Sequence, residues 1–105
     1  MIHHIALFKL KPGVTEAKLD EMILESRIRL LKITGVNNLK VGKNIDTAHA
    51  HQFFYAVDLE NPDRVDIFLN DALLLKYQEE IIKPNTLERS NFCFEMETNK
   101  TRLSN

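Results

Sequence analysis

The chain has 105 residues, of which 44% are hydrophobic and 28% charged, a composition typical of a single soluble globular domain. Its 14 basic and 15 acidic residues give a formal net charge of −1, which excludes the dense cationic surface that nonspecific nucleic-acid binding needs. No stretch approaches the roughly 18 apolar residues of a membrane span, and the N-terminus lacks a signal-peptide pattern. We therefore expect a cytoplasmic protein that binds neither nucleic acid nor membrane.

The pattern predicts four strands and two helices in the order strand, helix, strand, strand, helix, strand. In chain order the expected elements cover residues 2–10, 15–33, 36–41, 52–59, 62–82 (with a break at 70–71) and 89–96. This order predicts an α+β fold with a ferredoxin-like βαββαβ protomer, in which two helices cover one face of an antiparallel four-stranded sheet. Residues 1–96 form one expected domain, and residues 97–105 a polar C-terminal tail.

The first expected strand is apolar on both faces. Ile5 and Leu7 lie on the face that the two helices cannot cover, whereas an antiparallel sheet open to water should be polar there. Burying a large apolar side chain stabilises a protein by roughly 1.5–3 kcal/mol, and a side chain left in water loses that contribution. We therefore predict a homodimer whose sheets face each other through Ile5 and Leu7, with His3 at the edge of that interface.

The long helix carries two apolar stripes. One stripe should cover the sheet and comprises Leu19, Met22, Ile23, Ser26, Leu30 and Ile33. Leu24, Ile28 and Leu31 lie nearly opposite and form a second stripe, which we call the α-helical ridge. Scattered exposed apolar residues are common. Because these three stack on one another, we expect the ridge to pack against the tail through Leu103 or against another dimer.

The segments HHIALFKLKPGVTE, ITGVNNLKVGKN and SNFCFE resemble the stress-responsive A/B barrel (Dabb) domain family, over Met1 to about Met96. The resemblance implies ferredoxin-like protomers that dimerise through their sheets into an α+β barrel. It also implies an apolar cavity between the helices and the sheet of each protomer.

One plant branch of that family is a polyketide cyclase, which uses a Tyr and a His around a His-Pro-x-His motif. Matching this motif to FLNDALLLKY places Phe68 at the Tyr, Asp71 and Leu74 at the two His, and Ala72 at the Pro. Phenylalanine has no hydroxyl and leucine accepts no proton, so that chemistry should be absent. Only His4 matches a His of the pattern.

The candidate ligand-binding residues face the expected cavity. They are His4, Phe8, Met22, Ser26 and Phe68. We predict a non-catalytic module that binds a small apolar molecule and needs no cofactor. The alternatives are a cyclase-like or other lyase enzyme that uses His4, and a purely structural dimer. His4 itself can equally be a core histidine whose ring is satisfied by a backbone group or water.

Metal binding and thiol chemistry are not expected. His49 and His51 resemble a ligand pair, but the predicted antiparallel pairing puts them roughly 20 Å from His3 and His4, so no four-histidine site can form within one protomer. A pair across the dimer stays open. Cys93 is the single cysteine, which excludes an intramolecular disulfide, and we expect it to be a small packed thiol rather than a nucleophile.

Overall fold

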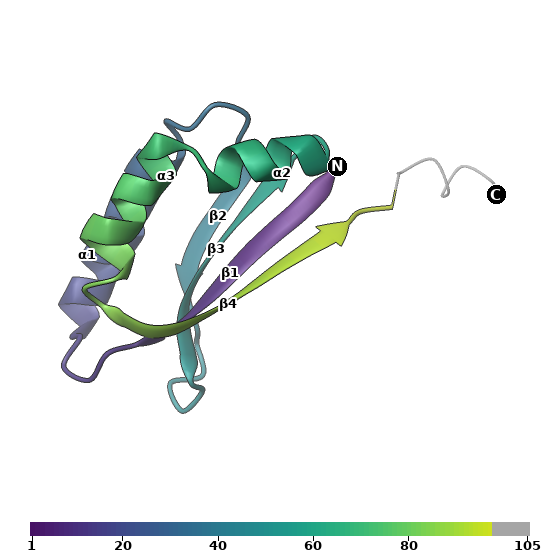
Figure 1. The fold of residues 1–105 in the computed structure, drawn as a ribbon. Coiled ribbons are helices and arrows are strands. Elements are labelled where there is room, and N and C mark those ends of the chain that lie inside the picture. Colours follow the sequence, from purple (N-terminus) through teal and green to yellow (C-terminus); the bar gives the residue numbers. More distant parts are fainter. Residues whose placement is uncertain (98–105) are drawn as a thin grey trace.

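The computed structural model describes residues 1–97 and has two layers, a four-stranded sheet and a layer of helices on one of its faces (Figure 1). The elements in chain order are β1 (Ile2–Leu10), α1 (Glu16–Leu30), β2 (Asn37–Lys43), β3 (His51–Leu59), α2 (Pro62–Leu69), α3 (Ala72–Tyr77), η1 (Gln78–Ile82) and β4 (Thr86–Glu95). The predicted α+β, ferredoxin-like βαββαβ order is confirmed. Leu103 and the rest of the tail beyond residue 97 lie outside the described residues.

The sheet has the strand order β2-β3-β1-β4, with every neighbouring pair antiparallel. β1 therefore lies in the interior of the sheet, where both of its edges are hydrogen-bonded. Its side chains alternate between buried positions under the helices and half-buried positions on the other face. We call the helix-covered side the inner face and the other side the outer face.

The largest differences from the predicted elements are at the end of α1, at the start of β4 and in the hydrogen bonding of the second helical region. α1 ends at Leu30 and not at residue 33. The amides of Lys32 and Ile33 bond to carbonyls three residues back, as in a 3₁₀ turn, so the α-helical hydrogen-bonding pattern stops there. β4 begins at Thr86, three residues early, through pairing with Leu10. The second helical region ends in a π-type turn, η1, in which the amide of Lys83 bonds to the carbonyl of Gln78.

Side-chain caps fix the start of each α-helix. The Thr15 hydroxyl accepts a hydrogen bond from the Lys18 amide, the Asn61 side chain from the Arg64 amide, and the Asp71 side chain from the Leu73 amide. Each cap satisfies an amide that the first helical turn leaves unpaired. The Asp71 cap also explains the predicted break, because the chain restarts as α3 directly after it.

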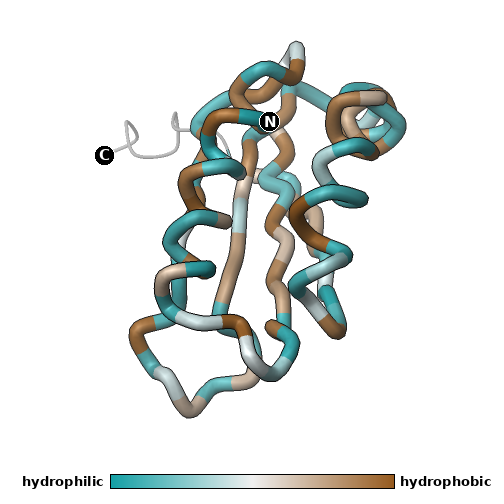
Figure 2. The backbone as a smooth tube through the Cα atoms, turned by 90° about the vertical axis from the view of Figure 1, so that its left-hand side faces the viewer, coloured by the Kyte–Doolittle hydropathy of each residue, from teal (hydrophilic) through white to brown (hydrophobic). Residues whose placement is uncertain are grey.

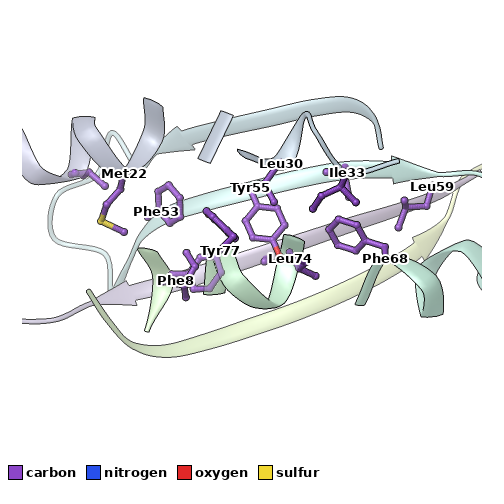
Figure 3. Packing of buried hydrophobic residues seen from close by; sticks show 14 residues of the cluster. Phe8, Met22, Leu30, Ile33, Phe53, Tyr55, Leu59, Phe68, Leu74 and Tyr77 are labelled. Carbon is purple, nitrogen blue, oxygen red and sulfur yellow. The ribbon is translucent and has the colours of Figure 1, made fainter. Parts of the chain in front are cut away.

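The hydrophobic core fills the space between the helices and the inner face (Figure 3). It contains Ala6, Phe8, Leu19, Met22, Leu30, Ile33, Phe53, Tyr55, Val57, Leu59, Phe68, Leu74, Tyr77 and Ile82. The predicted sheet-facing stripe of α1 contributes to it as expected, and the α-helical ridge faces outward, with Leu31 61% exposed. Hydrophobic and hydrophilic segments alternate along the backbone (Figure 2). Within residues 1–97, no helix is both long enough and apolar enough to cross a membrane.

Candidate functional site

All five predicted ligand-binding residues lie in the layer between the helices and the inner face. Phe8 and His4 come from β1, Met22 and Ser26 from α1, and Phe68 from α2. Each of the five is at most 1% exposed. The structure therefore brings them together in the protomer core, while their role in binding stays a prediction.

His4 is the polar centre of this region. Its ring lies edge-on to Phe68, with centroids 5.6 Å apart, and 6.1 Å from the ring of Tyr55. Its Nδ1 is 3.2 Å from the Cys93 sulfur, and the tautomer decides which atom donates. Its buried Nε2 has no hydrogen-bond partner among residues 1–97. Buried polar atoms are nearly always paired, so this nitrogen is the group most in need of a further partner.

The chain's two tyrosines, Tyr55 and Tyr77, both lie in the same core, although neither was among the residues predicted from the sequence. The Ser26 hydroxyl donates to the Met22 carbonyl at 2.6 Å, which leaves its oxygen to accept from the Tyr77 hydroxyl at 2.7 Å. The ring of Tyr55 lies 6.1 Å from that of Tyr77. Burial raises the pKa of Tyr55 to about 12 and raises that of Tyr77 as well. Both phenols are therefore neutral hydrogen-bonding groups at physiological pH.

The motif that the cyclase resemblance singled out supplies packing groups instead of acid–base groups. Phe68 and Leu74 are both core residues, and Asp71 caps α3. The alternation of the strand could have predicted that Tyr55 faces the core. It is two residues from both Phe53 and Val57, and side chains two residues apart on a strand lie on the same face.

Cys93 lies beside His4 on the inner face of β4, as the strand register requires. The expectation of a packed thiol is wrong, because the residue is exposed. β4 is an edge strand, and the helices do not cover its inner face at this point. Desolvation of the sulfur still raises the pKa of Cys93, which disfavours the thiolate that a nucleophile needs.

His3 lies on the outer face and takes part in a polar cluster of its own. Its Nδ1 is 2.8 Å from one oxygen of the buried Asp58 carboxylate, and Asn38 donates to the other oxygen at 2.8 Å. Burial alone would raise the pKa of Asp58, but the hydrogen bonds from His3 and Asn38 outweigh it and lower that pKa. The carboxylate is therefore charged and well satisfied near neutral pH.

The remaining histidines lie at the far end of the β1–β3 pair. His51 pairs with Lys9, whereas His3 pairs with Asp58. The rings of His49 and His51 are 5.7 Å apart. No group of three or more His, Cys, Asp or Glu side chains among residues 1–97 could hold a metal ion.

Two of the cavities that open among residues 1–97 are large enough to consider, and none of the five predicted ligand-binding residues lines either. One, of about 560 Å³, lies between the α3–η1 segment and β4. The other, of about 280 Å³, lies at the β2–β3 hairpin and is lined in part by Leu7, Phe53 and Phe54.

The burial of His4 predicts a loss of stability in mildly acidic solution. Desolvation, with smaller effects of His3 and Arg89, lowers the pKa of folded His4 below its ordinary 6.5. The unfolded chain then binds a proton that the folded chain rejects, so the free energy of unfolding falls as the pH drops through about 6.5 towards the folded pKa. Urea titrations between about pH 7.5 and 5 should show this decline.

The His4→Phe variant, which lacks the titrating ring, should show a flatter decline over the same range. The exposed His49→Gln variant should follow the wild type. Equal slopes for the wild type and His4→Phe would mean that His4 is not the group that titrates.

The comparisons with known proteins agree with this architecture. The family model of the Stress Responsive A/B Barrel Domain (Dabb) matches residues 2–98. A Dabb family protein with a ferredoxin-like fold from Mesorhizobium loti superposes with a TM-score of 0.79 at 12% identity, over 92% of this chain and 97% of that one. No curated protein sequence matches the chain.

Two further solved structures are similar. A dimeric ferredoxin-like protein of unknown function from Thermobifida fusca has a TM-score of 0.78 at 23% identity, with 90% of each chain covered. A protein from Bordetella bronchiseptica, provisionally named an antibiotic biosynthesis monooxygenase, has a TM-score of 0.71 at 16% identity, over 92% of this chain and 97% of that one. At these identities the likeness concerns the fold. The family match spans nearly the whole chain, and the chain therefore belongs to the stress-responsive A/B barrel (Dabb) domain family.

Proposed function

We propose that this Dabb protein is a homodimer joined through the outer faces of its sheets, and that each protomer is a non-catalytic module that binds a small apolar molecule beside His4. The observation that carries the binding role is the unpartnered, buried Nε2 of His4. Ligand sites are mostly apolar with a few polar groups that fix orientation. One imidazole nitrogen among the rings of Phe68 and Tyr55 supplies such a polar group. Neither of the two cavities opens beside it, so a ligand would have to displace side chains of the packed core.

The outer face supports the dimer. The predicted interface residues Ile5 and Leu7 are half-buried there. Phe92 and Phe94 stack beside them on β4, 45% and 56% exposed. Apolar patches of this kind mark association surfaces. Solved structures with the same fold from Thermobifida fusca and Bacteroides fragilis are described as dimeric.

A catalytic role for His4 is the second candidate, of cyclase or other lyase type. The lowered pKa of His4 keeps its imidazole neutral, as a general base requires, and Tyr55 places a second polar group near it. Against this role, the residues that match the Tyr and the second His of the cyclase motif are Phe68 and Leu74. The binding role needs no group that titrates.

Native mass spectrometry of the freshly purified protein tests the binding role. We expect the mass of two chains plus a small molecule that is released on unfolding. The adduct should be depleted in His4→Phe and retained in His49→Gln. A dimer without any adduct in every variant would contradict binding and favour a purely structural dimer, and a monomer would contradict the dimer itself.

A further inference from the structure

The cavity between the α3–η1 segment and β4 is separate from the core around His4. It lies on the inner side of the sheet, where the helical layer ends in the π-type turn. Its volume of about 560 Å³ falls within the range of small-molecule sites.

Apolar side chains from both sides form part of the wall. Leu75 and Ile82 come from α3 and η1, and Leu87 from β4. Leu75 and Leu87 are about half exposed, at 48% and 53%. Leu75 and Leu87 face the cavity from opposite walls. An apolar ligand between them would bury its own apolar surface and that of both leucines.

Of the two cations in the lining, Arg89 is the one without an ion-pair partner among residues 1–97. Lys83 is paired with Glu79 at 3.4 Å, whereas Glu88, which lies opposite Lys9 in the β1–β4 register, forms no ion pair within residues 1–97. Arg89 has no ion pair with any carboxylate of residues 1–97. It lies opposite Phe8, a core residue, so the register places it on the inner face.

We infer that this cavity binds a small organic carboxylate, with the Arg89 guanidinium holding the carboxylate and the apolar part of the ligand resting against Leu75, Ile82 and Leu87. A guanidinium presents a planar fork of N–H donors that matches a carboxylate with two parallel hydrogen bonds. The site shares no residue with the one proposed around His4. Because the Arg89 charge also lowers the pKa of His4, binding has to be followed at the residues that line this cavity.

Titration of the full-length protein with octanoate, followed by amide and methyl NMR, tests this inference. Octanoate should cause saturable shifts at Leu75, Ile82 and Leu87, and 1-octanol, which has the same chain without the charge, should bind at least about tenfold more weakly. Arg89→Gln should weaken octanoate by a similar factor and leave 1-octanol unchanged. Arg64→Gln, which removes an exposed arginine outside the lining, should bind octanoate like the wild type.

A second variant guards against an indirect effect of changing β4. Leu75→Glu puts a negative charge on the opposite wall and should repel octanoate while Arg89 remains in place. Shifts that fall outside the lining residues, equal affinities for octanoate and 1-octanol, or unchanged octanoate binding by Arg89→Gln would each overturn the inference.

Discussion

Replacing Phe8 with alanine is expected to lower the free energy of unfolding by about 3–5 kcal/mol. The side chain is 1% exposed and packs against Phe53 and Tyr55, with ring centroids 5.5 and 5.8 Å away. Its removal leaves a cavity between the helices and the inner face, and β1, which is hydrogen-bonded on both sides, cannot easily move to fill it. A loss of this size is a large part of the roughly 5–15 kcal/mol that stabilises a domain.

Urea denaturation followed by far-UV circular dichroism would measure the loss. All samples need the same protein concentration, because association contributes to the apparent stability. Leu73→Ala is the matched control, since it removes a large apolar side chain that is 47% exposed on α3. It should change the free energy of unfolding by no more than about 0.5 kcal/mol. A Phe8→Ala loss below about 1 kcal/mol would contradict the packing described here.

Periodicity in the sequence predicted the architecture because each element carries its own signal. β1 alternates in burial, α1 follows a cap at Thr15, and α2 starts with Pro62 after the Asn61 cap. No sequence signal predicts the π-type turn η1, because Gln78–Ile82 continues the helical pattern of α3. The amide of Lys83 bonds to the Gln78 carbonyl, five residues back, and the local residue pattern does not distinguish this bond from the usual one to the residue four positions back.

The candidate site was predictable only in part, for a related reason. The inward parity of His4 and Phe8 follows from one strand, and that of Met22 and Ser26 from one helix. The contact between Ser26 and Tyr77 joins residues 51 positions apart, and that between His4 and Cys93 residues 89 apart. Such contacts arise from strand order and from how helices pack. They cannot be predicted from the residue pattern within any single helix or strand.

The same limit applies to the cavity beside Arg89. Its walls come from the end of one helical segment and from an edge strand, and its uncovered state reflects where the helical layer stops. In the sequence, Arg89 is only one of several surface cations.

Introducing a charge on the outer face should dissociate the proposed dimer. Phe92 lies opposite Ile5 in the register and extends the apolar outer face onto the edge strand β4. Phe92→Glu would place a carboxylate there without a partner, and it would also remove an aromatic side chain worth roughly 1.5–3 kcal/mol when buried. We expect the dissociation constant to rise at least about a hundredfold, equivalent to about 2.7 kcal/mol.

Sedimentation velocity over a range of protein concentrations would resolve dimer from monomer. Asn91→Glu is the matched control, because Asn91 is exposed on the same strand but lies opposite the buried Ala6, on the inner face. It adds the same charge one residue away and should leave the dimer intact. If both variants remain dimeric, the protomers associate through another surface, for which the ridge of Leu24, Ile28 and Leu31 is the next apolar patch to test. If both dissociate, the effect is one of net charge or of strand stability rather than of the outer face.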